Sequence, residues 1–169
     1  MMRALGAVLV AAGGAWLGLR AAEELRRRER ALDDMVSGLA LLEQELGLGG
    51  LPLAPMFHAL SEQVRGPAKN LFAACGSELL RTDRPAFPVT WSRLVEELPG
   101  LDKEAKRTLS LLGETLGRCD SGSQQQAVKA VRTQLEELRC RAGDERRRQG
   151  RVYQILGLTG GAFLVILLM

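Results

Sequence analysis

Leucine recurs every seven residues through residues 20–46, and this repeat constrains the fold more than any other feature of the chain. The repeated positions are Leu25, Leu32, Leu39 and Leu46, with Met35 and Leu42 at the second position of the repeat. Such spacing places the apolar side chains along one stripe of an α-helix, and that stripe must be buried against a partner. The glycine-rich run that starts at Gly47 predicts the end of this helix.

A second stretch, residues 123–151, carries a matching stripe. Its apolar positions alternate at steps of three and four residues: Val128, Val131, Leu135, Leu138 and Ala142. At about 1.5 Å per residue, this stretch and the first are each about 40 Å long as helices. Because each stripe needs a partner of similar length, we predict that the two stretches form an antiparallel hairpin.

Both ends of the chain are apolar. The run Ala4–Leu19 is uncharged, and residues 152–169 carry no charge at all. As helices these runs would measure about 24 and 27 Å, close to the hydrocarbon thickness of a bilayer. We therefore predict an N-terminal transmembrane segment (1–19), a helical bundle (20–151) and a C-terminal transmembrane segment (152–169). A cleaved signal peptide is the alternative for the first segment.

Arginines crowd the inner flanks of both apolar ends. The net charge of the chain is only +3, but arginines cluster within residues 20–30 and within residues 139–151. Positive charge beside a membrane segment favours the cytoplasmic side and anionic lipid. We therefore expect a cell-membrane protein with residues 20–151 in the cytoplasm and with membrane lipid beside its arginines. A nucleic-acid-binding protein would instead carry its basic residues on the far face of the bundle.

Helix-boundary residues divide the middle of the chain into four shorter helices. Glycine and proline stand at helix ends rather than at hairpin spacing, which favours an all-α fold, an antiparallel helical bundle whose two long helices continue into the membrane segments. The four predicted helices are residues 52–64, 67–81, 89–98 and 102–116. The last long helix begins at Asp120, a good cap, or at Ser121, where the sequence to Gln124 matches a capping box.

The chain carries no motif of an enzyme or of a cofactor site. Its single histidine, His58, lies within a predicted helix, and we expect a surface or partly buried residue rather than a catalytic one. The three cysteines, Cys75, Cys119 and Cys140, are too widely spaced for a zinc motif and are interpreted as small apolar residues in a reducing compartment. We predict a scaffold or adaptor without enzyme activity, cofactor or metal. A membrane-bound enzyme or sensor, the rival class, would need a polar cleft.

Each predicted membrane segment contains two glycines four residues apart. The pairs are Gly14 with Gly18 and Gly157 with Gly161. Small residues at this spacing let helix backbones approach closely within a bilayer, although glycine is also common in membrane helices generally. We predict that these glycines pack the two membrane helices against each other or against another membrane protein.

Several runs of the sequence together point to one family. They are the glycine-bearing first segment, the LLEQEL run that ends at Leu46, Phe72, Trp91, and the closing apolar run. The most specific residues are Leu112-Gly113, Leu116-Gly117, Asp120 and Gln124, with Leu156-Gly157 and Gly160-Gly161. Over its full length the chain thus resembles the stage III sporulation protein AB family of endospore-forming bacteria. The glycine-rich Gly47–Gly50 departs from the turn that is usual in this family.

The resemblance implies an all-helical cytoplasmic domain similar to those of type II secretion platform proteins. It also implies a platform component of the channel complex between mother cell and forespore, located in the mother-cell membrane around the forespore. The expected partners are the secretion-type ATPase of the same operon and other membrane components of the complex. A helical adaptor or regulator of another secretion-like complex is the alternative, and association into a homo-oligomer is left open.

The turns at residues 47–53 and 117–124 should meet at one end of the predicted hairpin, because the two long helices are of equal length. Three of the family-like residues, Gly117, Asp120 and Gln124, fall there. We predict that they bind the partner. The alternative is that Gly117 only ends a helix and Asp120 only caps one.

Overall fold

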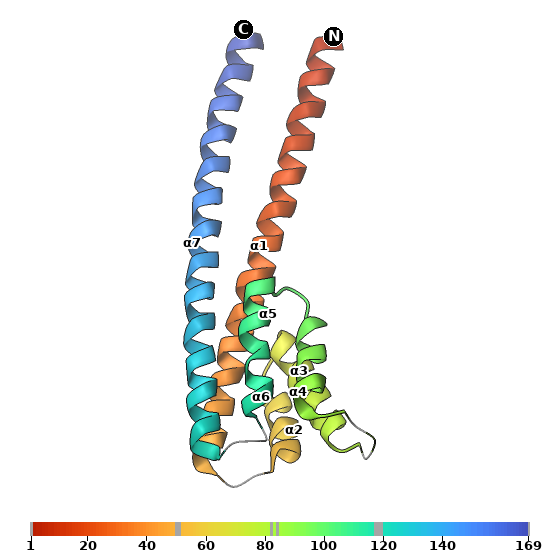
Figure 1. Cartoon of the computed structure of the whole chain (residues 1–169). Helices are drawn as coiled ribbons and strands as arrows, with labels where there is room; N and C mark the ends of the chain where they lie inside the picture. The colour runs from red at the N-terminus through yellow and green to blue at the C-terminus, as the bar shows by residue number, and fades with distance from the viewer. Residues whose placement is uncertain (1, 50–51, 82, 84, 117–119, 169) are drawn as a thin grey trace. The chain divides into compact units, whose positions relative to one another are not determined.

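The computed structural model is all-α, as predicted. It describes the backbone of residues 2–49, 52–81, 83, 85–116 and 120–168, and the side chains of residues 20, 22–49, 52–81, 83, 85–116, 120 and 122–148. Over these ranges the chain forms helices and no strand (Figure 1). The elements are α1 (Met2–Leu48), α2 (Leu53–Gln63), α3 (Gly66–Leu79), α4 (Phe87–Glu96), α5 (Lys103–Ser110), α6 (Leu112–Thr115) and α7 (Ser121–Leu168).

The helices divide into two compact units. One unit is Arg28–Cys140, called here the bundle. The other consists of Met1–Arg27 and Arg141–Met169, called here the arms, which are the outer parts of the helices α1 and α7. The candidate interaction site described below lies entirely within the bundle.

No helix in the described part of the chain has a run long and apolar enough to cross a membrane. The predicted transmembrane segments, 1–19 and 152–169, lie outside the residues whose side chains the structure describes. The same is true of the four glycines that were predicted to pack these segments: Gly14, Gly18, Gly157 and Gly161. Membrane insertion of the two segments therefore stays a prediction.

Inside the bundle, α1 and α7 bury the two predicted stripes. On α1, Leu32, Met35, Leu39 and Leu42 are fully buried and Leu46 is 8% exposed, whereas Leu25 in the arms is half-buried. On α7 the stripe residues Val128, Val131, Leu135 and Leu138 are buried, as is Ala142 in the arms. The two helices lie side by side there (Figure 1) and are joined by ion pairs, so the predicted hairpin is confirmed within the bundle.

Three of the four predicted short helices are confirmed to within a few residues as α2, α3 and α4. The fourth prediction, a single helix over 102–116, is wrong because the helix is interrupted at Leu111. The indole N–H of Trp91 donates to the carbonyl of Leu109 at 2.8 Å. In a continuous helix the N–H of Gly113 would bond that carbonyl. The interruption therefore accommodates a contact with a tryptophan on another helix.

Four aromatic side chains form the centre of the short-helix layer. Phe57 of α2 lies within 6.3 Å, centroid to centroid, of Phe72, Phe87 and Trp91. Trp91 and Phe57 are fully buried, and Gly113 of α6 lies directly against the tryptophan. Because a Cβ on Gly113 would stand 2.9 Å from Cδ1 of Trp91, only glycine fits here without a shift of the ring. The aromatic cluster thereby joins α2, α3, α4 and α6.

Glycines also let α3 lie close to α1. A Cβ on Gly38 of α1 would stand 2.8 Å from the Cβ of Ala68 on α3, so the two helices touch through their smallest residues. At the start of α3, Gly66 has a φ of +56° and lies beside the carboxylate of Asp34. That carboxylate brings negative charge to the positive end of the α3 dipole. Burial, followed by the neighbouring Asp33, raises the pKa of Asp34, and Arg65 opposes this rise.

Asp102 connects α5 to α1. Its Oδ1 accepts a hydrogen bond of 3.0 Å from the backbone N–H of Ala105, so it caps α5 as predicted. Its Oδ2 pairs with the guanidinium of Arg28 on α1. One carboxylate therefore both starts a helix and holds that helix on α1.

The cysteines were interpreted as small apolar residues, and one of them lies in the core. Cys75 is fully buried, and its burial raises the pKa of the thiol to about 12. Cys140 is exposed and lies two positions beyond the stripe residue Leu138. Cys119 lies outside the described residues.

Substitution of Gly113 by alanine tests the packing against Trp91. The added Cβ overlaps a large buried ring, so we expect Gly113→Ala to lower the free energy of unfolding by about 1–3 kcal/mol, measured by denaturant titration. The control is Gly122→Ala, where the nearest side-chain atom is an oxygen of the exposed Asp120 at 3.2 Å. The control should change stability little or raise it by up to about 1 kcal/mol. Equal stability of Gly113→Ala and the natural chain would contradict this packing.

Candidate interaction site at the α1–α7 tip

The end of α1 and the start of α7 meet at one end of the bundle, called here the tip and defined by residues 47–49 and 120–126. The helix α1 ends at Leu48, and Gly49 follows with a φ of +59°. The backbone N–H of Gly49 still donates to the carbonyl of Glu45 at 3.3 Å. The predicted stop in the glycine-rich run is therefore confirmed, and Gly49 provides the left-handed conformation that ends the helix.

Asp120 caps α7. Its Oδ2 accepts from the backbone N–H of Ser123 at 3.1 Å, and its Oδ1 accepts from the Ser123 hydroxyl at 2.8 Å. Of the two predicted starts for this helix, the structure therefore selects the one that Asp120 caps. The bonds from Ser123 hold the pKa of Asp120 below its usual value. Because the carboxylate is also exposed, the tip carries a solvent-accessible negative charge except in strong acid.

Gln125, which follows the predicted partner-binding residue Gln124, joins the two helices at the tip. Gln124, the predicted partner-binding residue, is only 8% exposed. The side-chain amide of Gln125 donates to the carbonyl of Glu43 on α1 at 3.4 Å. It also lies so close to Gly47 that a Cβ there would be 2.6 Å from the amide nitrogen. Gly47 therefore provides room for the glutamine in addition to preceding the helix end.

The tip presents one large apolar side chain that the sequence analysis did not single out. Leu48 is 72% exposed, next to the turn that contains Gly49. The seven-residue repeat predicts this exposure, because Leu48 lies two positions beyond the stripe residue Leu46 and is therefore outside the buried stripe. Gly117, the third predicted partner-binding residue, lies outside the described residues. The site that the structure describes is thus an exposed leucine at the end of α1 and a helix-capping aspartate at the start of α7, on two helices that Gln125 joins.

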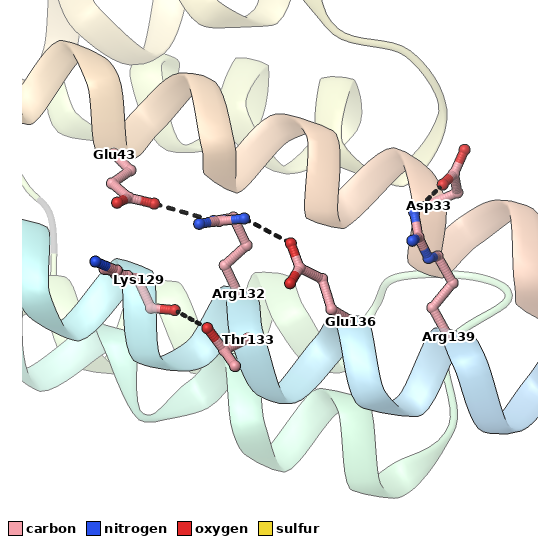
Figure 2. A network of polar contacts seen from close by, with 7 residues as sticks. All are labelled: Asp33, Glu43, Lys129, Arg132, Thr133, Glu136 and Arg139. Atoms are coloured by element: carbon pink, nitrogen blue, oxygen red, sulfur yellow. Dashed lines mark hydrogen bonds and ion pairs between the residues drawn. The ribbon is translucent and has the colours of Figure 1, made fainter.

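Ion pairs along the outer edge of α1 and α7 continue from the tip into the bundle (Figure 2). Arg132 lies between Glu43 on α1, at 3.0 Å, and Glu136 on its own helix. Both partners of the Glu43–Arg132 pair are largely shielded, with 19% and 25% of their side chains exposed. The hydrogen bond that Arg132 donates to Glu43 is the main cause that raises the pKa of Arg132. This pair therefore fixes the position of α7 along α1 near the tip.

A second, more exposed pair lies farther along the same edge. Arg139 of α7 contacts Asp33 of α1 at 2.7 Å, with 39% and 60% of their side chains exposed. The bond to Asp33 raises the pKa of Arg139. Together the two pairs define an antiparallel register in which α1 residues 43 and 33 face α7 residues 132 and 139.

The residue types that could support catalysis or bind a metal do not form a cluster in the described part of the chain. His58 is exposed on α2, as the sequence analysis expected of a surface residue. Among the described residues, no three of His, Cys, Asp and Glu come together in a group that could hold a metal ion. Near the tip, the polar groups that come together include the Asp120 cap and the ion pairs between α1 and α7, and these hold the helices together.

Comparison of the chain with known proteins finds matches in one protein family. A family model described as stage III sporulation protein AB matches residues 3–169. The stage III sporulation protein AB of Bacillus subtilis (strain 168) is 28% identical over 172 residues, and the alignment covers 100% of each chain. A solved structure of a stage III sporulation protein AB has a TM-score of 0.63 and 28% identity, and the match covers 72% of this chain and 97% of that one.

A double-mutant cycle tests whether the shielded ion pair holds the two helices together. We expect the coupling energy of Glu43→Gln with Arg132→Gln to be about 1–2 kcal/mol, because charged hydrogen bonds shielded from water are among the stronger ones. The same cycle on Asp33 and Arg139, which are more exposed, should give less than about 1 kcal/mol. Added salt should weaken the second coupling more than the first. Equal couplings for the two pairs would refute the role of Glu43–Arg132.

Proposed function

The chain belongs to the stage III sporulation protein AB family, whose members are sporulation proteins, and from this premise we propose that it is a scaffold of the channel complex between mother cell and forespore. In this proposal the protein has no enzyme activity and needs no cofactor. The family's description as a sporulation protein family, rather than as an enzyme family, supports that part. The helical bundle corresponds to the cytoplasmic domain of a secretion platform protein.

The proposed placement is the mother-cell membrane around the forespore. Residues 1–19 and 152–169 would span the bilayer, with Gly14, Gly18, Gly157 and Gly161 at their packing face. The uncharged runs and the arginines beside them support this topology, with the bundle in the cytoplasm. Other membrane components of the complex, or further copies of the chain, would pack against the two spans.

We propose that the scaffold couples a cytoplasmic secretion-type ATPase to the membrane assembly, and that the tip binds this ATPase. The tip is held by Asp120, Gln125 and the Glu43–Arg132 pair, so its two helices have little freedom to lose on binding. It also exposes Leu48 at the end of α1 and the Asp120 carboxylate at the start of α7. An exposed apolar side chain and a fixed charge at the same end of the bundle suit a protein partner that offers an apolar pocket with a basic rim.

Charge removal at a retained cap tests the tip. Asp120→Ser keeps an oxygen that can cap α7 but removes the negative charge. We expect the melting temperature to stay within a few degrees of that of the natural chain, while capture of the ATPase by the full-length protein in detergent falls several-fold. Leu48→Ser should weaken capture in the same way. Gln124→Ala is unsuitable because Gln124 is buried and its loss would affect folding.

The matched control for Leu48→Ser is Leu80→Ser. Leu80 is 77% exposed but lies at the end of α3 rather than at the tip. Full ATPase capture by both tip variants, or equal loss in the Leu80 control, would remove the tip from the proposal. Capture of a different secretion-type complex in place of the sporulation ATPase would favour the alternative function, an adaptor or regulator of that complex.

Thiol labelling in intact sporulating cells tests the topology. Cys140 is exposed, whereas Cys75 is buried with a thiol pKa of about 12 and should not react. In a chain with Cys119→Ser, a membrane-impermeant maleimide should therefore label Cys140 only after the cells are permeabilised. The control Cys140→Ser should remain unlabelled in both conditions. Labelling of Cys140 in intact cells would place the bundle outside the cytoplasm.

A further inference from the structure

The arms and the bundle carry opposite net charges. Residues 20–27 and 141–151 contain eight arginines and four acidic residues, which leaves +4. Arg3 adds one more positive charge, and the whole chain is +3, so residues 28–140 carry a net charge of −2. Positive charge is therefore concentrated on the part of the chain that adjoins the two uncharged runs.

Four of the seven exposed arginines among the described residues of the arms, called here the arm arginines, carry much of this charge: Arg26, Arg27, Arg147 and Arg148. Among the described side chains, no carboxylate pairs with Arg26, Arg147 or Arg148. Arg27 pairs with Glu23 at 3.1 Å, but about two thirds of both side chains is exposed, at 67% and 65%. Such a pair competes weakly with other anions. In the bundle, by contrast, Arg132 and Arg139 are held by carboxylates of the facing helix.

Arginine is the main cation of both units, with ten arginines beside four lysines in the bundle. All four lysines of the chain, Lys69, Lys103, Lys106 and Lys129, lie in the bundle, and the arms contain arginine only. Positive-inside topology alone is satisfied by either residue. A guanidinium, however, donates two parallel hydrogen bonds to a phosphate, which an ammonium cannot do. The arginines of the arms are therefore suited to recognise phosphate in addition to supplying net positive charge.

We propose that the arm arginines form a binding site for the phosphate headgroups of anionic phospholipids. The site rests on the proposed membrane anchoring, because the uncharged runs Ala4–Leu19 and Val152–Met169 would bring these arginines to headgroup level. The guanidinium groups of Arg26, Arg147 and Arg148, which have no carboxylate partner among the described side chains, can then bind lipid phosphates on the cytoplasmic leaflet. The binding would hold the two arms at a defined depth and favour regions of the membrane rich in anionic lipid.

Native mass spectrometry of the full-length chain in neutral detergent tests the site with added phosphatidylglycerol. Each cation near an anionic surface contributes a factor of about five to binding. The combined change Arg26→Gln, Arg147→Gln and Arg148→Gln should therefore lower the ratio of lipid-bound to free protein by at least about tenfold. The charge-conserving variant with Lys at the same positions should also bind less than the natural chain. Unchanged binding by either variant would overturn the proposal.

The matched control removes three exposed cations from the bundle: Lys69→Gln, Lys103→Gln and Arg107→Gln. It should retain phosphatidylglycerol fully, and an equal loss in this control would reduce the effect to net charge and overturn the site. Phosphatidylcholine should be retained far less than phosphatidylglycerol. Displacement of the lipid by inorganic phosphate at equal concentration, or tighter retention of a DNA duplex, would also contradict a lipid site.

Flotation with vesicles of phosphatidylcholine alone separates this inference from membrane anchoring. The natural chain and all three variants should float with these neutral vesicles, because anchoring depends on the uncharged runs. A natural chain that does not float would refute the anchoring. Chains that float but show no preference for phosphatidylglycerol would refute only the phosphate site.

Discussion

The bundle depends on burying the apolar residues of α1 on two sides at once. One side forms the seam with α7, where Leu32 and Leu39 are fully buried. The other side meets α3, where Gly38 touches Ala68. Burial of one such leucine stabilises the fold by about 1.5–3 kcal/mol, but a two-helix hairpin leaves one side of each helix in water. The five short helices therefore complete a core that the two long helices cannot form alone.

The leucine repeat by itself does not determine how the two long helices align. A shift of α7 by seven residues would bury the same stripe, because the repeat has that period. In one direction the shift would place Arg132 against Val36 and Arg139 against Arg26; in the other it would place Arg139 against Ala40. Each shift loses both ion pairs and leaves a guanidinium facing an apolar or a like-charged residue. The polar edge of the seam thus selects one register among several that the apolar stripe allows.

The helices and the buried stripes could be predicted from the sequence because their signals are local. Period, caps and helix-ending glycines lie within a few residues of the structure they determine, and Asp120 and Asp102 both cap as expected. The break at Leu111 could not be predicted, because it depends on Trp91 on another helix. The close fit of Gly113 has the same origin. Contacts between residues distant in sequence produce no periodic pattern in the sequence from which they could be predicted.

The burial of Gln124 and the exposure of Cys140 both had a local signal in the sequence. Gln124 lies four residues before Val128, so the stripe of α7 continues to it and buries it, while Gln125 is turned by about 100° toward α1. Cys140 lies two residues after Leu138 and so falls off the same stripe. In both cases the helical phase indicates whether the side chain is buried, whereas the residue type alone does not. Phase is the stronger argument on a long helix, because packing determines which face is buried.

The requirements of folding explain some of the residues at the tip but not all of them. The need to cap α7 explains the position of Asp120, and Gln125 explains why residue 47 is glycine. Neither explains Leu48, since an α-helix can end equally well on a polar residue before Gly49. Single exposed apolar residues are common, and Leu80, Val89 and Leu111 are others on this bundle. What distinguishes Leu48 is that both helices around it are tied, and a pre-ordered surface loses less entropy when a partner binds.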